Sequence, residues 1–189
     1  MARHRTIDRE AMLDAAERVV SREGAARLTL EAVALEAGIS KASVIYDYKT
    51  KRALIRAMIE RRVASEEMRV QALLDAAPAQ ADARIRAEVT SASRSFSDQE
   101  RSVALNLCAA LAQDEELREP VQASLHRTIT AISSESRQPG GAMLAFLAIE
   151  GLMLLEWFGL HSFPGPERAR LIADIGWLID QSPTSSSLD

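Results

Sequence analysis

The chain has 189 residues, of which 47% are hydrophobic and only 4% aromatic. This length suits one domain or two small ones, and the low counts of Gly (8) and Pro (6) favour helix. A single cysteine, Cys108, excludes an internal disulfide framework and suits a reducing cytoplasm. Because the first ten residues hold no apolar run, we expect no signal peptide.

The net charge of −4 is unevenly distributed along the chain. Residues 1–63 hold 13 Lys/Arg and 9 Asp/Glu, a balance of +4, whereas the rest holds 10 basic and 18 acidic residues, a balance of −8. A basic head joined to an acidic body is typical of a nucleic-acid-binding module attached to another domain.

The first expected helix spans Ile7–Glu23, where apolar residues recur at helical spacing and Gly24 ends the pattern. A second helix, Leu30–Ala37, follows the N-cap residue Thr29 and ends at Gly38. A third is expected over Lys41–Asp47 after Ser40, and a fourth from Thr50 to about Asp75.

The charges at two of these helix starts are unusual. Lys41 follows the N-cap Ser40, and Lys51 and Arg52 follow Thr50, with no acid in either first turn. The positive end of a helix dipole repels cations and attracts anions. These bases are therefore best explained by a partner that supplies negative charge, as the phosphates of DNA do.

Helical periodicity continues through the rest of the chain, and no strand pattern of alternating residues occurs. Further helices are expected over Gln80–Phe96, Asp98–Ala112, Asp114–Glu135, Ala142–Leu160 and Glu167–Asp180, with a loop at Gln138–Gly141. We therefore expect an all-α fold. The helix at Ala142–Leu160 is nearly long enough to span a membrane, but Glu150 near its middle argues against that, so no membrane association is expected.

Residues 29–54 fit a helix-turn-helix. Ala34, Gly38, Ile39 and Val44 supply the small contact residue, the turn and the apolar anchors, whereas Ser40, Lys41, Ser43 and Tyr46 face outward. An ordinary helical hairpin is the alternative. The lysines at the helix starts and the tyrosine pair, Tyr46 and Tyr48, favour the helix-turn-helix.

The stretch from Thr29 through Ala37-Gly38-Ile39-Ser40, Tyr46-Asp47-Tyr48 and Thr50-Lys51 to Leu54 resembles the TetR family of bacterial transcriptional regulators. The resemblance covers about residues 7–60. It implies an N-terminal three-helix helix-turn-helix DNA-binding domain (1–50) and a C-terminal helical ligand-binding and dimerisation domain (51–181). It also implies a homodimer that binds a palindromic operator and is released by an unknown small-molecule effector. The composition of the tail (182–189), rich in Ser, predicts disorder.

The resemblance assigns roles to individual residues. Thr29 and Ser40 would hold phosphates, Lys41, Ala42 and Ser43 would lie near base edges, Tyr46 would touch the DNA backbone, and Lys51 would bind a phosphate. Tyr48 would be the buried aromatic that locks the recognition helix. Arg5 is also expected among the DNA contacts. The chain departs from the family at Ile45, which cannot bond a phosphate oxygen, and at Asp47, which would repel one.

The last two helices are apolar nearly all round and must be buried on most faces. We expect them to form a dimer interface, with burial inside one chain as the alternative. The expected interface residues are Ala148, Gly151, Met153, Leu155, Ile175 and Leu178.

Effector contacts are expected from polar or aromatic residues inside apolar stretches, namely Asn106, His126, Glu150 and Trp157. No catalytic constellation, metal-ligand spacing or phosphate loop occurs, so no enzyme activity, metal or cofactor is expected. The sequence predicts a cytoplasmic, ligand-responsive, sequence-specific repressor. The alternative is a helical protein-interaction module without specific DNA binding.

Overall fold

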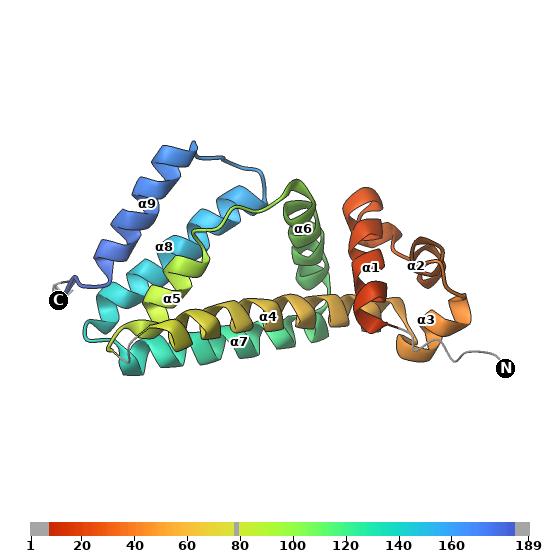
Figure 1. The fold of residues 1–189 in the computed structure, drawn as a ribbon, viewed down its shortest axis with the longest axis horizontal. Coiled ribbons are helices and arrows are strands. Elements are labelled where there is room, and N and C mark those ends of the chain that lie inside the picture. Colours follow the sequence, from red (N-terminus) through yellow and green to blue (C-terminus); the bar gives the residue numbers. More distant parts are fainter. Residues whose placement is uncertain (1–7, 78–79, 184–189) are drawn as a thin grey trace. The chain divides into compact units, whose positions relative to one another are not determined.

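The computed structural model describes residues 8–77 and 80–183. Within these ranges it contains nine α-helices, one short 3-10 helix and no strand, which confirms the all-α fold class (Figure 1). The helices are α1 (Arg9–Glu23), η1 (Ala25–Arg27), α2 (Leu30–Ala37), α3 (Lys41–Asp47), α4 (Lys51–Ala76), α5 (Ala83–Ser91), α6 (Asp98–Gln113), α7 (Glu115–Glu135), α8 (Pro139–Trp157) and α9 (Gly165–Leu178).

The chain forms two compact units. Unit 1 comprises Met1–Arg62 and Ser97–Val121, and unit 2 comprises Val63–Phe96 and Gln122–Asp189. This division differs from the expected boundary at residue 50, because α6 packs against α1 and η1 and so belongs with the N-terminal helices. Most of the expected tail, residues 184–189, lies outside the described residues.

The core of unit 1 is built on the apolar stripe of α1. Met12, Ala15, Ala16 and Val19 are buried there, against α2 and α6. Asp8 caps the helix, since its carboxylate accepts hydrogen bonds from two backbone N–H groups of the first turn.

Local signals set the bounds of α2 and α3, which agree with the sequence-based prediction. The Thr29 hydroxyl accepts a hydrogen bond from the N–H of Ala32, and Ser40 caps α3 in the same way through Ser43. Between them Gly38 adopts a left-handed conformation (φ 65°), which glycine tolerates without steric cost.

The amide of Asn106 joins α6 to the turn after α1. Its Oδ1 atom accepts a 3.1 Å hydrogen bond from the N–H of Ala25, and its Nδ2 atom donates to the carbonyl of Ser102. Ser102 in turn donates to the carbonyl of Ser21. These bonds satisfy polar backbone groups at the α1–η1 junction and hold α6 in unit 1.

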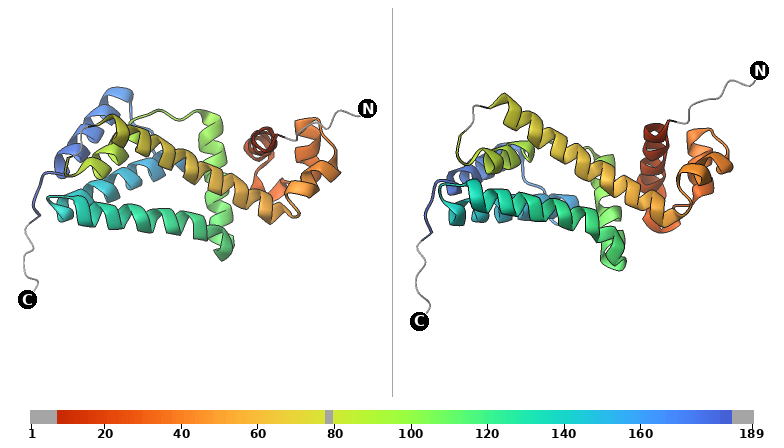
Figure 2. Two further views of the ribbon diagram at one scale, coloured as in Figure 1. Left: turned by 60° about the horizontal axis from the view of Figure 1, so that its bottom comes forward. Right: turned by 90° about the horizontal axis from the view of Figure 1, so that it is seen from below.

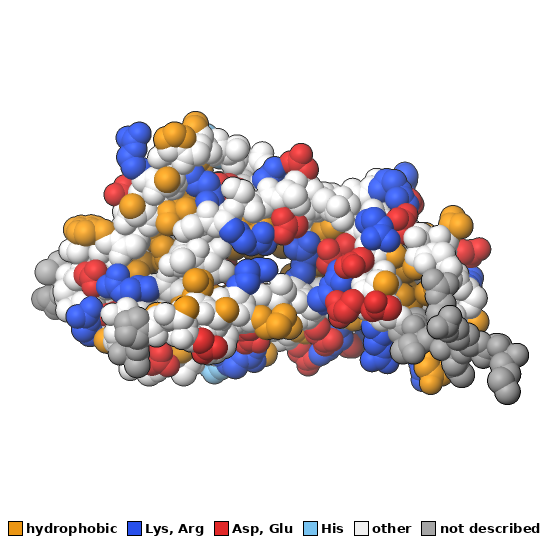
Figure 3. Space-filling model, viewed as in Figure 1, with side chains coloured by type: hydrophobic (Ala, Val, Ile, Leu, Met, Phe, Trp, Pro, Cys, Tyr) orange, Lys and Arg blue, Asp and Glu red, His pale blue; other side chains and the backbone are white. Residues whose placement is uncertain are grey.

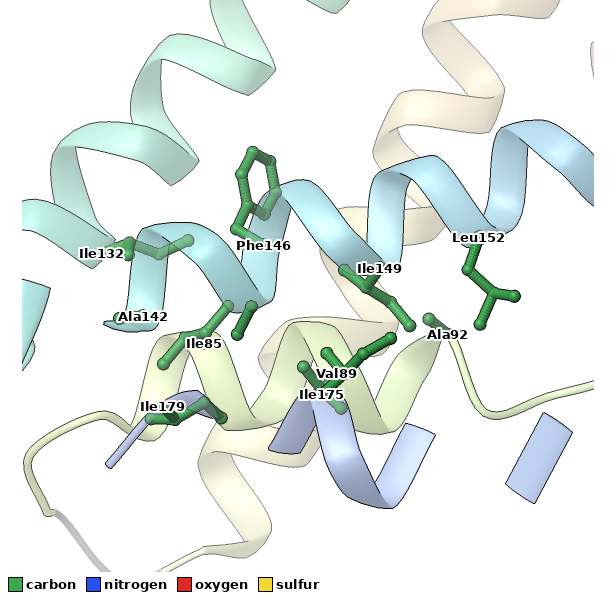
Figure 4. Packing of buried hydrophobic residues seen from close by; sticks show 11 residues of the cluster. Ile85, Val89, Ala92, Ile132, Ala142, Phe146, Ile149, Leu152, Ile175 and Ile179 are labelled. Atoms are coloured by element: carbon green, nitrogen blue, oxygen red, sulfur yellow. The ribbon is translucent and has the colours of Figure 1, made fainter. Parts of the chain in front are cut away.

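In unit 2, α8 runs alongside α5 and α9 (Figures 1 and 2). Their facing sides form a hydrophobic core that includes one residue of α7 (Figure 4). Its members are Ile85, Val89, Ala92, Ile132, Ala142, Ala145, Phe146, Ile149, Leu152, Ile175 and Ile179.

Gly141 explains why α8 begins earlier than expected. The helix starts at Pro139, a favoured first-turn residue, so the expected loop at Gln138–Gly141 is instead mostly its first turn. A Cβ atom on Gly141 would collide with the backbone carbonyls of Leu178 and Gln181. Gly141 therefore reflects close packing of α8 on the end of α9 and not a flexible turn.

Two ion pairs stabilise the ends of helices in unit 2. The Asp82 side chain is 1% exposed and accepts hydrogen bonds from the N–H and the Nε–H of Arg137. Arg168 donates to the Glu156 carboxylate at 2.8 Å and to the carbonyls of Ala92 and Ser93, where α5 ends. Both side chains of the Arg168–Glu156 pair are only 13% exposed.

By length and hydropathy α8 could also cross a membrane, and it is the one described helix for which this holds. A single such helix is weak support for a membrane location, because core helices of other proteins meet the same criteria. The inner face of α8 contributes much of the core of unit 2.

Candidate functional site

The exposed face of α3 is the centre of the candidate DNA-binding surface in unit 1. Val44, on the inner side of this helix, is fully buried, and Tyr48, which follows the helix, is 9% exposed. Both side chains anchor α3 as expected. On the opposite side, Tyr46 is 81% exposed. Ile45 is 42% exposed, so it contributes less to packing than its apolar character suggests.

Hydroxyl groups surround the start of α3. The Ser40 Oγ atom accepts a hydrogen bond from the N–H of Ser43 and lies 2.8 Å from the Ser43 Oγ atom. The Thr29 hydroxyl caps α2. In each cap the oxygen accepts a bond from the helix. One hydrogen of the Ser40–Ser43 pair is donated between the two hydroxyls, which leaves the other, and that of Thr29, able to turn toward an anion.

Lys41 lies beside an acid from the preceding helix. Its Nζ atom is 3.1 Å from Glu31 Oε2, and both side chains are more than half exposed. An exposed pair of this kind contributes little to stability, so the lysine can exchange this partner for another at small cost. Ala42, its neighbour, is exposed.

Lys51 is held at the start of α4. Its Nζ atom donates a 2.6 Å hydrogen bond to the carbonyl of Ala26 in η1. The Thr50 hydroxyl caps α4 through the N–H of Ala53. Lys51 thus keeps two further N–H donors for a partner. Arg5, the remaining expected DNA contact, lies outside the described residues.

Asp47 is paired within unit 1 and does not face outward as a free acid. Its side chain is 7% exposed, and its Oδ1 atom lies 2.8 Å from both the Nε and the NH2 atoms of Arg9. The expectation that Asp47 would repel phosphate is corrected by this contact, since the charge is neutralised and covered by an arginine of α1.

Glu150 lies inside unit 2 near two other carboxylates. Glu66 accepts from Ser91 Oγ at 2.5 Å and pairs with Arg69, and Glu88 pairs with Arg84 at 2.7 Å. Glu150 has no hydrogen bond or ion pair within the described ranges. Burial, and to a lesser degree the charges of Glu88 and Glu66, raise the pKa of Glu150 to about 7.

The other expected effector residues are dispersed. Asn106 belongs to unit 1, where its amide is used in the hydrogen bonds described above, and His126 is exposed on α7. Trp157 packs edge-on against Phe96, with 5.6 Å between ring centroids, and its buried Nε1–H has no hydrogen-bond partner in the described part of unit 2. These positions favour Glu150 and Trp157, both on α8, over Asn106 and His126, and all four stay predicted effector contacts.

Burial divides the six expected interface residues into two groups. Ile175 is a core residue, and Ala148, Met153 and Leu178 pack against the same core from within the chain. Ile175 is therefore covered within the chain, whereas Ala148, Met153 and Leu178 are only partly buried and stay predicted interface residues. Gly151 and Leu155 remain near or at the surface, since a Cβ on Gly151 would meet open space and Leu155 is 38% exposed.

A different row of apolar residues is exposed on α8 and α9. Figure 3 shows hydrophobic side chains at the surface over α9. The row on α8 follows helical spacing of three and four residues, and Trp177 of α9 is 62% exposed. The exposed residues of this row on α8 are Leu144, Leu147 and Leu154, with Gly151 between the last two.

A recognition helix seated on α2, with its exposed face flanked by basic helix starts, defines a helix-turn-helix DNA-binding protein. The sequence matches two family models, "Bacterial regulatory proteins, tetR family" over residues 12–58 and "Tetracyclin repressor-like, C-terminal domain" over residues 82–180. The chain belongs to the TetR family of transcriptional regulators, which are not enzymes, and the resemblance seen in the sequence is confirmed.

Solved structures share the fold at low sequence identity. A candidate transcriptional regulator from Streptomyces coelicolor A3(2) is 22% identical, with a TM-score of 0.70, and the match covers 92% of this chain and 98% of that one. One from Saccharomonospora viridis, in complex with choline, is 20% identical, with a TM-score of 0.70 and coverage of 92% and 95%. The multidrug binding protein EbrR, complexed with imidazole, is 19% identical, with a TM-score of 0.66 and coverage of 96% and 98%. No curated protein matches the sequence.

Proposed function

We propose that this protein is a homodimeric, ligand-responsive repressor in the cytoplasm that binds a palindromic operator through α3. The observation that carries the proposal is the exposed face of α3, with Lys41, Ala42 and Tyr46 turned outward from the buried anchors Val44 and Tyr48. A helix held in this way can enter the major groove and present short side chains to base edges.

The roles of the DNA-binding residues follow from their chemistry. Lys41, Ala42 and Ser43 would read bases, and the Ala42 methyl group could contact a thymine. The Tyr46 hydroxyl, the Thr29 and Ser40 hydroxyls and the Lys51 ammonium would hold phosphates and fix the register of the helix. Arg5 is retained as a further proposed contact.

Binding to DNA is tested by gel shift on the protein's own upstream region at two salt concentrations. A protein that neutralises phosphates loses affinity steeply as salt rises, because bound counterions are released. We expect one fragment to be retained at the higher salt and a random duplex to be lost. Equal binding to both fragments would overturn operator recognition, and no binding at either salt would favour the protein-interaction alternative.

The dimer is proposed to form through the exposed row on α8 together with Trp177. An exposed apolar row of this kind is more typical of an interface than of a solvated surface. Two-fold symmetry of the protein would then match the two half-sites of a palindrome, about 34–36 Å apart.

Sedimentation tests the interface. Leu147→Glu should yield a monomer with reduced operator affinity, whereas Leu125→Glu, at a 38% exposed position on α7, should remain a dimer. A wild-type monomer at micromolar concentration would overturn the proposed dimer. A dimeric Leu147→Glu variant would show that the interface does not include Leu147.

The effector is proposed to be a small cation bound in unit 2 beside Glu150. The carboxylate of Glu150 has no cationic partner among the residues of unit 2 that the structure describes, and a cation bound there would stabilise its charged form. Choline, a quaternary cation, occupies the related protein from Saccharomonospora viridis. A ligand that binds the DNA-free state better would shift the population away from the operator.

Calorimetry and gel shift with choline as the probe test this role. Wild-type protein should bind choline and release DNA, and Glu150→Gln should bind DNA normally but respond at least about tenfold more weakly to choline, which corresponds to roughly 1.4 kcal/mol. An unchanged choline response in the variant would exclude Glu150 from the site. A wild-type protein that ignores choline and other quaternary ammonium ions would overturn the cation class.

A further inference from the structure

The Arg9–Asp47 pair lies where α1 begins and α3 ends (Figure 1). We propose that Asp47 positions Arg9 as a DNA phosphate contact, so that a backbone contact of the recognition helix is provided by the first helix. This inference rests on the proposed DNA-binding function. Neither Arg9 nor Asp47 is among the DNA-binding residues that the sequence predicts.

The exposure of the two side chains differs sharply. The Asp47 side chain is 7% exposed and the Arg9 side chain is 70% exposed. An ion pair whose base is largely exposed contributes little to the stability of the fold, because solvent screens the interaction. Here the acid is sheltered and the base is presented outward, which is the arrangement expected when the acid holds the base for a third group.

The donors of Arg9 are only partly used. A guanidinium carries five N–H groups in a fixed plane, and Asp47 is within 2.8 Å of the Nε and NH2 atoms. Within the described ranges no other hydrogen bond of Arg9 is found, which leaves the NH1 group and one NH2 hydrogen for a partner. Arginine suits this role, because its fork fits carboxylate and phosphate oxygens in the same plane.

The position of Arg9 also fits a phosphate contact. Asp47 directly follows Tyr46, which is 81% exposed on α3, so Arg9 flanks the face proposed to meet DNA. Arg9 is moreover the first residue of α1, where the helix dipole disfavours a cation. It is thus a further base at a helix start of unit 1, in addition to Lys41, Lys51 and Arg52. The one acid of that first turn, Glu10, is directed to Arg61.

The test measures the salt dependence of binding to a random-sequence duplex, which requires no knowledge of the operator. Each phosphate contact contributes about 0.9 to the slope of log K against log salt. The variants are Arg9→Ala, Asp47→Asn and the double variant, with Arg18→Ala as the matched control. Arg18 is also an arginine of α1 in an ion pair, but its partner, Glu36, lies on α2.

Arg9→Ala is expected to weaken binding at least about tenfold for the dimer and to flatten the slope by roughly 1 per subunit. Asp47→Asn keeps the charge of Arg9 but releases its side chain, so affinity should fall while most of the slope remains. Arg9→Lys keeps the positive charge but lacks the planar fork, so compared with Arg9→Ala it should restore the salt slope more fully than the affinity. Arg18→Ala removes the same charge and should leave the slope unchanged.

The double variant separates positioning from simple neutralisation and avoids an unpaired buried acid, so it should fold. If Arg9 contacts phosphate, the double variant keeps the flattened slope of Arg9→Ala. If Arg9 merely neutralises Asp47, the double variant binds like wild type, and the inference is overturned. Failure of the wild-type protein to bind any duplex would instead overturn the proposed function.

Discussion

Lys51 and Ala26 are joined by a 2.6 Å hydrogen bond from the lysine Nζ atom to the backbone carbonyl. The bond ties the start of α4 to the short η1 turn that leads into α2. Lys51 therefore has a partner within unit 1 as well as a proposed partner on DNA. These two roles have separable consequences.

Lys51→Ala should weaken binding to specific and random DNA alike and flatten the salt slope by roughly 1 per subunit, because one phosphate contact is lost. It should also lower the free energy of unfolding by about 1 kcal/mol through loss of the bond to Ala26. Gel shift over a salt series and thermal unfolding measure the two effects. A lower melting temperature with an unchanged slope would show that Lys51 acts only within the fold.

Glu31→Gln should strengthen binding to random DNA several-fold, because it removes an acid beside Lys41 and leaves that lysine free for phosphate. Stability should change by less than about 0.5 kcal/mol, since Glu31 is largely exposed. Glu60→Gln, which removes the same charge from an i,i+4 pair on α4, is the control. If both variants gain affinity equally, general charge and not the Lys41 contact is responsible.

Glu150 should make the stability of the protein depend on pH. Its pKa is about 7 in the fold against an ordinary value of 4.5, so between these values the native state keeps a proton that the unfolded state releases. Stability from this group is fully present below about pH 4.5 and is lost as pH rises to about 7, by roughly 3 kcal/mol at most.

Glu150→Gln should abolish this loss. Its advantage in unfolding free energy over the wild type should be small at pH 5 and largest at pH 8, measured by denaturant titration. Glu115→Gln, an exposed position at the start of α7, is the control. An advantage that is the same at both pH values would contradict the assignment, because it would not arise from deprotonation.

Gly141→Ala should destabilise unit 2 by about 1–3 kcal/mol or more, because the added methyl group meets backbone carbonyls that cannot move independently. Gly140→Ala is the matched control, since its Cβ would lie 3.3 Å from the Pro183 side chain only. Thermal unfolding of both variants checks the prediction. Equal melting temperatures would show that α9 shifts freely away from α8.

The sequence predicted α2 and α3 to the residue because their bounds depend on local chemistry. The hydroxyls of Thr29 and Ser40 and the left-handed Gly38 act within a few residues of their own positions. The start of α8 is predicted incorrectly, because it depends on a contact between distant parts of the chain. Gly141 lacks the Cβ atom that would collide with the backbone of Gln181, a residue far along the chain. A local sequence pattern cannot predict such a contact.

The candidate sites show the same contrast. Helical spacing identified α8 and α9 as apolar, but it could not decide which apolar face the chain itself would cover, so Ile175 was assigned outward and lies in the core. Likewise the sequence does not show that the Asn106 amide accepts a hydrogen bond from Ala25, because the two residues are distant in the chain and meet only in the folded unit 1. Arg9 carries one usable sequence signal, a base in the first turn of a helix, which the sequence analysis applies only to Lys41, Lys51 and Arg52.

The Arg168–Glu156 contact makes the connection between α8 and α9 a closed ring, because the two residues bracket residues 157–167 and are bonded to each other at 2.8 Å. This contact, only 13% exposed on both sides, holds the end of α8 beside the start of α9. Leu160, at 73% exposed, lies at the outer part of the ring. This makes the connection a suitable place to graft a fluorescent or affinity peptide, so that the regulator could be followed in living cells with both its termini left untouched.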